Sequence, residues 1–254
     1  LYDLEERVGD DLAAIMLEVP PEPSHVPREV TRLTLQAYQF TAQRHKALFI
    51  LDEVVTGLRY GLGGAQAMYG ITADLACFSK ALGNGFPISA ITGPRDLMQA
   101  FEGGKVFLST TFGASPIGLA AAQAVLAALP HEHPALVEHG GAFLEGLAML
   151  LAQWCMPVNL RGNFGRIVLD WYECNGITAA QLKTLWMQEM ISRGVLVSVC
   201  FLPMTAWRQE TVTHLLAAVE ATCAVISSVV RGDKGINEVL RCPVVDEVFD
   251  RNKV

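Results

Sequence analysis

Two short segments of this chain carry reactive side chains that a folded core does not need. Residues 52–56 read DEVVT, directly after an apolar run, and residues 79–85 read SKALGNG, with a lysine in a loop bounded by glycines. Apolar neighbours on both sides of Lys80 partly remove water from its amine. Loss of water disfavours the charged ammonium form, so the free amine becomes able to attack a carbonyl carbon.

Each of these side chains also has a simpler structural interpretation. A lysine in a loop is usually solvated. The carboxylates of Asp52 and Glu53 can cap whatever helix or loop begins after them. The chemical interpretation therefore depends on whether the fold brings the two segments to one place.

The surrounding sequence predicts elements that position both segments. Apolar runs at residues 13–18 and 47–51 predict buried strands, and apolar residues at helical spacing predict a helix over residues 27–46 between them. A strand, a helix and a second strand joined in this way form the βαβ unit of a parallel sheet. Further strands are predicted at residues 74–79 and 88–93.

In a parallel α/β sheet, ligands collect at the carboxyl ends of the strands. Asp52 follows one predicted strand, and Ser79 and Lys80 end the next, so these side chains are expected at the same rim. A carboxylate and an amine at one sheet edge suit a cofactor that has a basic ring nitrogen and an aldehyde.

The pattern of elements changes near residue 134. Pro130 and the HEHP stretch at residues 131–134 predict a break between an alanine-rich helix and a second helix that ends near residue 153. Beyond it, the predicted elements are strands at 158–161, 166–171 and 195–199 and helices at 178–193 and 209–230. We therefore predict a large α/β domain over residues 1–134, a small C-terminal α+β domain over 135–232, and a tail over 233–254.

Composition excludes several classes of protein. The 254 residues are 51% hydrophobic and 18% charged, and they carry a net charge of -7 without a cluster of Lys and Arg. A nucleic-acid surface needs such a basic cluster to neutralise phosphates.

No uninterrupted apolar run reaches about 18 residues, so we expect no membrane span. Six scattered cysteines without CxxC spacing predict reduced thiols and a cytoplasmic location, and we expect no metal site.

A family resemblance is carried by residues 48–93, which read LFILDEVVTGLRYGLGGAQAMYGITADLACFSKALGNGFPISAITG. This segment closely resembles the core of the class III pyridoxal-phosphate-dependent aminotransferases, most of all their glutamate-1-semialdehyde aminomutase branch. The resemblance extends over nearly the whole chain. It implies fold type I, with a mainly parallel sheet in a large domain, here incomplete, and a small α+β C-terminal domain. The implied cofactor is pyridoxal 5'-phosphate.

The resemblance also implies roles for individual residues. Lys80 would form a Schiff base with the cofactor aldehyde and act as general base, and Asp52 would pair with the ring nitrogen, which makes the ring an electron sink. Val54 would pack on one ring face, and Ser79 would place a hydroxyl near the phosphate. Thr111 matches a family threonine that reaches a phosphate across a dimer interface, which implies a homodimer.

Some positions depart from the family pattern. Glu18 matches an acid at the end of an early strand near the cofactor, but Val19 replaces the proline that often follows it. The family's glycine-serine phosphate loop and its stacking aromatic precede the first residue of this chain. We therefore expect an N-terminal segment, from the same gene product or from a companion chain, to complete the site.

The implied activity is transfer of an amino group between a small amine or amino acid and a carbonyl compound, as an aminotransferase or an aminomutase. Racemases and decarboxylases with this fold share the lysine and the aspartate, so the cofactor is more closely specified than the reaction. The alternative is a non-catalytic, aminotransferase-like scaffold or remnant that keeps the fold and has lost cofactor binding.

Overall fold

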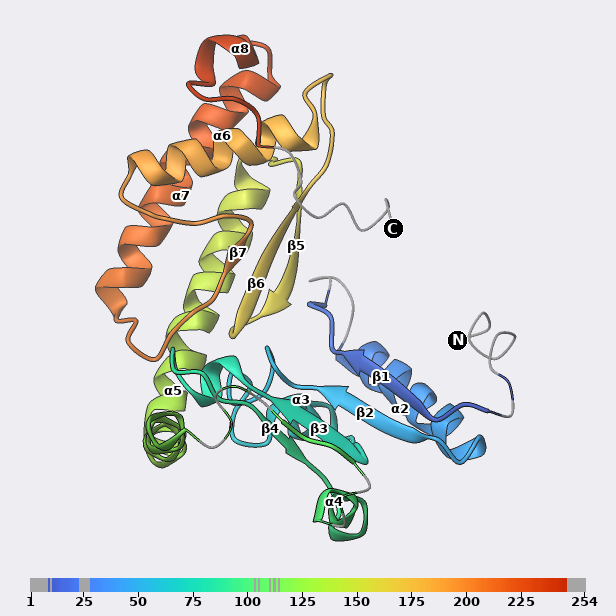
Figure 1. Ribbon diagram of the computed structural model, residues 1–254. Coiled ribbons are helices and arrows are strands. Elements are labelled where there is room, and N and C mark those ends of the chain that lie inside the picture. The colour runs from blue at the N-terminus through green and yellow to red at the C-terminus, as the bar shows by residue number, and fades with distance from the viewer. Residues whose placement is uncertain are drawn as a thin grey trace. The chain divides into compact units, whose positions relative to one another are not determined.

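The computed structural model contains two compact units (Figure 1). Unit 1 comprises Leu1–Pro20 and Val26–His133, and unit 2 comprises Pro21–His25 and Pro134–Val254. The structure describes residues 9, 11–22, 28–102, 104, 106–109, 111, 113 and 115–245. The predicted helix start at residue 27 and residues 246–254 of the predicted tail lie outside the described residues.

Unit 1 is built on a four-stranded sheet in the order β1-β2-β3-β4. The strands are β1 (Ala14–Glu18), β2 (Leu48–Asp52), β3 (Leu75–Phe78) and β4 (Ala90–Thr92). The first three are parallel, and β4 is antiparallel to β3. The apolar runs predicted all four strands, and the long helical crossover from β1 to β2 explains why those two are parallel.

One face of this sheet is covered by helix α2 (Arg28–Arg44). Phe49 and Leu51 of β2 are fully buried in a cluster that also contains Leu35 and Ala42 of α2. On the other face, Met16 of β1 is 56% exposed. This alternation follows from the two-residue period of a strand. The sequence did not predict the short helix α3 (Gly64–Tyr69), and helix α4 (Arg95–Glu102) follows β4.

The predicted helix break at residues 131–134 is wrong. A single helix, α5 (Pro116–Gln153), runs through this stretch, although the boundary between the two units falls between His133 and Pro134. A proline removes one backbone donor and crowds the carbonyl four residues earlier, but the bonds of the neighbouring turns remain. Alanine and leucine, which favour helix, flank the stretch on both sides and maintain it.

Unit 2 contains an antiparallel sheet in the order β5-β6-β7 that packs against three helices (Figure 1). The strands are β5 (Val158–Asn163), β6 (Arg166–Trp171) and β7 (Cys200–Phe201), and the helices are α6 (Ala179–Ser192), α7 (Gln209–Val230) and the second half of α5. Trp186, Leu182 and Phe143 are fully buried in the shared core. A large apolar core of this kind is the main source of stability of the unit.

The strand predicted at residues 195–199 is also wrong, because pairing begins only at its end. Val195 and Val197 are buried and Leu196 is 91% exposed, which is the alternation of an extended segment. The first hydrogen bond between this segment and β6 is the one from the amide of Leu169 to the carbonyl of Val199, with 2.8 Å between N and O. Strand β7 begins at the next residue, Cys200. Periodicity reports which side chains are buried, whereas a strand also needs a neighbour at the correct distance.

Helices α5 and α7 are long and apolar enough to cross a membrane by length and composition alone. Buried core helices pass the same test. In α7, residues such as Val219, Cys223 and Ile226 are fully buried in the core of unit 2.

The C-terminal segment of residues 239–245 is bound along α6. Gln188 of α6 donates to the carbonyl of Val239 and accepts from the amide of Arg241, and Thr184 accepts from the amide of Val245. Glu189, which is 7% exposed, accepts hydrogen bonds from the guanidinium groups of Arg193 and Arg241 at 2.7 and 2.9 Å.

The balance of forces on Glu189 leaves its carboxyl more acidic than usual. Burial alone would raise the pKa of Glu189, but the hydrogen bonds from Arg193 and Gln188 and the charges of Arg193 and Arg241 lower the pKa below its ordinary value. A group with a lowered pKa in the folded state stabilises that state above its unfolded pKa, and this contribution is lost as the pH falls through the folded value.

We predict that Glu189→Gln destabilises unit 2 by about 1–3 kcal/mol at pH 7, since the guanidinium groups of Arg193 and Arg241 lose their charged acceptor. The free-energy difference between the variant and the original protein should shrink as the pH falls below about 4.3, the usual pKa of a glutamate. Urea unfolding at several pH values measures this difference, with Glu220→Gln on the exposed face of α7 as the control. An equal difference at pH 7 and pH 3 would contradict the assignment.

Candidate active site at the carboxyl edge of the unit 1 sheet

Three polar side chains form a row across the carboxyl ends of the parallel strands. Glu18 of β1 is paired with Asp52 of β2, and Asp52 is paired with Cys77 of β3. Neighbouring strands lie about 4.8 Å apart, and paired residues point to the same face. The amide of Glu53 donates to the carbonyl of Cys77, with 2.9 Å between N and O, so the ends of β2 and β3 are held together at the row.

Asp52 is held in place by the first turn that follows its strand. The amide of Val54 donates to Oδ1 of Asp52 at 2.9 Å, which leaves Oδ2 for a further partner. Asp52 and Val54 are both half-buried. A carboxylate fixed by one backbone donor at a sheet edge suits the binding of a cationic or protonated ligand group.

Lys80 follows the row three residues after Cys77, in a strained backbone conformation. Its φ angle is +40°, a left-handed value that residues with a side chain rarely adopt. Such strain costs about 1–3 kcal/mol and persists where the surroundings impose it. The side chain of Lys80 is exposed, so its amine is accessible, and the expected loss of water beside its apolar neighbours is wrong for this structure.

The loop around Lys80 is held by its neighbours. Residues Lys80–Leu82 form one turn of 3-10 helix, and Leu82 is buried in a cluster with Leu58 and with Ala122 of α5. A Cβ at Gly83 would lie 2.2 Å from the carbonyl oxygen of Phe86, so only glycine fits there. This anchoring explains how the loop tolerates the conformation of Lys80.

The remaining predicted site residues differ in their connection to the row. The hydroxyl of Ser79 donates to the carbonyl of Ile88 at 2.9 Å, so its proton is committed and its oxygen can only accept from a further group. Glu18 and Thr111 are exposed. Among the described residues, no hydrogen bond or strand pairing joins Thr111 to the row.

Sequence reasoning assigned no separate role to Glu53, which is the most buried charged group near the row. Its side chain is fully buried and accepts from the hydroxyl of Thr56 at 2.5 Å and from the amides of Ala65 and Gln66 at 2.9 and 3.0 Å. These amides belong to the first turn of α3, where a carboxylate is favoured. The capping interpretation is therefore correct for Glu53. Gly64, with φ +57°, lies so close that a Cβ would be 2.6 Å from the carboxylate.

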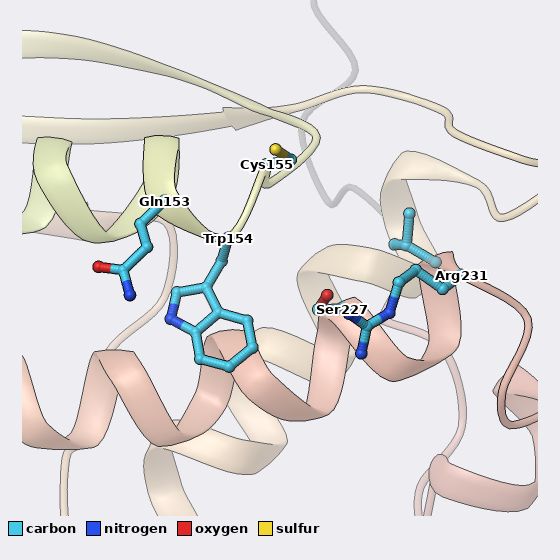
Figure 2. Close-up of a pocket in the computed structure, with 6 residues that line it drawn as sticks. Gln153, Trp154, Cys155, Ser227 and Arg231 are labelled. Atoms are coloured by element: carbon cyan, nitrogen blue, oxygen red, sulfur yellow. The ribbon is translucent and has the colours of Figure 1, made fainter.

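A pocket in unit 2 contains none of the predicted site residues. It encloses about 340 Å³ and is lined by Gln153, Trp154, Cys155, Ser227, Val230 and Arg231. Figure 2 shows the indole of Trp154 extending from the end of α5 toward α7, with its nitrogen on the side of Gln153. That nitrogen is buried without an acceptor. The pocket offers no reactive pair comparable to Asp52 and Lys80.

An α/β sheet with a lysine and an aspartate at its carboxyl edge is an arrangement of enzymes that bind carbonyl cofactors. The class-III aminotransferase family model matches residues 1–223, and the chain belongs to that family. This confirms the family predicted from residues 48–93.

The matched relatives include two glutamate-1-semialdehyde aminomutases. Glutamate-1-semialdehyde 2,1-aminomutase of Heliobacterium modesticaldum is 30% identical over 248 residues, which cover 88% of this chain and 54% of that protein. Glutamate-1-semialdehyde 2,1-aminomutase 2 of Brevibacillus brevis is 36% identical over 156 residues, covering 56% of this chain and 34% of that protein. The chain thus spans about half or less of the length of these relatives.

Solved structures confirm the predicted fold class. A transaminase with PLP bound has a TM-score of 0.80 and 22% sequence identity, and the match covers 91% of this chain and 56% of that chain. A beta-phenylalanine aminotransferase from Variovorax paradoxus has a TM-score of 0.73 and 22% identity, with 88% and 54% covered. At these identities the likeness concerns the fold alone.

We predict that Glu53→Ala destabilises unit 1 by about 3 kcal/mol, because three donors lose a charged acceptor inside the protein. Thermal or urea unfolding measures the loss. The matched control is Glu102→Ala at the exposed end of α4, which should change the free energy of unfolding by less than about 0.5 kcal/mol. Equal effects of the two substitutions would contradict an anchoring role for Glu53.

Proposed function

We propose that the protein containing this chain is a pyridoxal 5'-phosphate-dependent aminotransferase or aminomutase that forms its Schiff base at Lys80. The observation that carries the proposal is the row of Glu18, Asp52 and Cys77, with the exposed, strained Lys80 three residues beyond it. Strain at an exposed lysine in a well-anchored loop is typical of functional positions.

The residues present suit this cofactor. Asp52 has one oxygen fixed by the amide of Val54 and the other available for a protonated ring nitrogen. The side chain of Val54 is half-buried beside it and would contact one ring face. Lys80 would supply the amine, while Glu18 would add a carboxylate at the far end of the row. Ser79, whose oxygen can only accept, would need a donor on or near the ligand.

Pyridoxal phosphate, when bound, supplies an aldehyde for a covalent link to amines and a ring that takes up electrons from the substrate carbon. Asp52, as an ionised carboxylate, would stabilise the positive charge on the ring nitrogen. Lys80, once its amine is free, would remove and return a proton as the general base.

The names of the relatives favour a small amino donor and a carbonyl acceptor as substrates, and within that class an aminomutase reaction. The chain covers too little of those relatives for the reaction type to follow from the match. A cytoplasmic location remains a proposal, supported by six cysteines that are all free.

A second candidate function is a non-catalytic scaffold that has kept the fold. The observation that favours it is the departure from the family pattern at Val19, which replaces the proline that often follows the acid at the end of the early strand. The two candidates differ in cofactor binding. The full gene product that carries this chain binds pyridoxal phosphate if it is the enzyme and does not bind it if it is the scaffold.

We predict that the full gene product binds pyridoxal phosphate with a visible absorbance band that borohydride fixes to the peptide containing Lys80. Lys80→Ala should abolish the fixed adduct and lower amino transfer by at least about 100-fold, as expected for loss of a general base. Lys46→Ala is a matched control, because Lys46 is also exposed and also has a left-handed φ, of +55°. A colourless full protein, or an adduct that survives in Lys80→Ala, would overturn the proposal.

We further propose that the enzyme is a homodimer in which Thr111 of one subunit contacts the phosphate held by the other. Lys80→Ala and Thr111→Val should each be poorly active alone. Mixed under subunit exchange, they should form heterodimers in which one site has both Lys80 and Thr111, so activity should recover to roughly a quarter of the original level. If Lys80 and Thr111 act within one subunit, the mixture regains no activity. That result would contradict the contact across the dimer but not the proposed role of Lys80.

A further inference from the structure

Cys77 belongs to the row at the carboxyl edge, yet neither the family resemblance nor the proposed chemistry uses it. It is the strand partner of Asp52, and two residues lie between it and Lys80. Because paired residues of parallel strands point to the same face, its thiol and the carboxylate of Asp52 are neighbours on that face. The carboxylate of Asp52 also influences the thiol electrostatically, which agrees with this placement.

The face that carries Cys77 and Asp52 is the more open face of the sheet at these strand ends. Leu51 and Ala76, one position earlier in each strand, point to the opposite face and are 0% and 4% exposed. Asp52 and Cys77 are only half-buried in the described part of the chain. A flat ligand bound between Asp52 and Lys80 would therefore lie over Cys77 and not over Leu51 or Ala76.

We propose that Cys77 is a further contact residue of the cofactor site, with its thiol against the ring beside Asp52. This inference rests on the proposed function. Sulfur is polarisable and packs well against aromatic rings. A thiol is also small enough to leave room for a ring next to the strand.

The thiol would act as a neutral neighbour. Burial, and then the charge of Asp52, raise the pKa of Cys77, so it stays protonated at neutral pH. A neutral thiol adds no second negative charge beside Asp52, so the aspartate can remain ionised toward the ring nitrogen. The groups that face it from neighbouring strands are Asp52 on β2 and the apolar Ile91 on β4.

Thiol alkylation tests the contact in the full gene product, with internal controls in the same molecule. Iodoacetamide labelling, read by peptide mass spectrometry, is compared with and without pyridoxal phosphate. The cofactor should slow labelling of Cys77 by about tenfold or more, because thiol reactivity depends on access. Labelling of the exposed Cys155 and Cys242 should not change, and the buried Cys223, whose pKa is raised to about 12, should stay unlabelled in both samples.

Two substitutions test the space available beside the ring. Cys77→Ser should change the dissociation constant of the cofactor by less than about threefold, whereas Cys77→Leu should weaken it by about tenfold or more through overpacking. Cys155→Leu, outside unit 1, should leave the constant unchanged. The constant is read from the visible band, and circular dichroism checks that each variant folds. If Cys77→Leu fails to fold, the alkylation result decides.

The outcomes separate this inference from the proposed function. The contact is overturned if the visible band is fixed at Lys80 but the cofactor does not protect Cys77 from alkylation. It is also overturned if a folded Cys77→Leu variant binds the cofactor with unchanged affinity. Either result leaves the proposed function in place. A full protein that never forms the band overturns both.

Discussion

The hydrogen-bonded register between β2 and β3 is the constraint on which the candidate site depends. It places Asp52 beside Cys77, and the amide of Glu53 continues the ladder one step further to the carbonyl of Cys77. A shift of one residue would turn Asp52 toward α2 and bring Leu51 to the ligand side, because the side chains of a strand alternate between faces. The position of Asp52 beside the strand that leads to Lys80 is thus a property of the sheet.

The loops that follow these strands are each fixed by one buried group. After β2, the carboxylate of Glu53 binds the first turn of α3, and after β3, Leu82 fills an apolar cluster. The anchor after β2 is polar and the anchor after β3 is apolar, and neither of them uses the side chain of Asp52 or of Lys80. Asp52 and Lys80 are consequently able to keep conformations and exposures that would not be favoured by their own packing.

Much of unit 1 was predictable from sequence because its strands are continuous apolar runs. The positions of β1, β2 and β3 followed from residues 13–18, 47–51 and 74–79, and the family resemblance followed from the segments between them. Helix α3 was missed because six residues, GAQAMY, are too few for a helical period, and its stabilising partner is Glu53, far from it in sequence. The sequence left open whether the acids of DEVVT cap or catalyse, and the structure shows that Glu53 caps the first turn of α3.

The errors in unit 2 have local causes of a different kind. Pro130 and Pro134 were given too much weight, since the cost of each proline is confined to a single turn of α5. The segment at residues 195–199 has the alternating burial of a strand but lacks a partner over most of its length. The hydrophobic pattern of a sequence does not show how far a strand lies from its neighbour. It also does not show how strongly the turns on either side of a proline hold a helix together.

The bound C-terminal segment of residues 239–245 affects how this protein and its relatives can be recombined. The family match ends at residue 223, yet Arg241 supplies one of the cations that balance the buried Glu189 of α6. Exchange of residues 239–245 for those of a relative would separate the buried carboxylate of Glu189 from the guanidinium of Arg241. A chimera that exchanges residues 239–245 of this chain therefore needs α6 from the same parent.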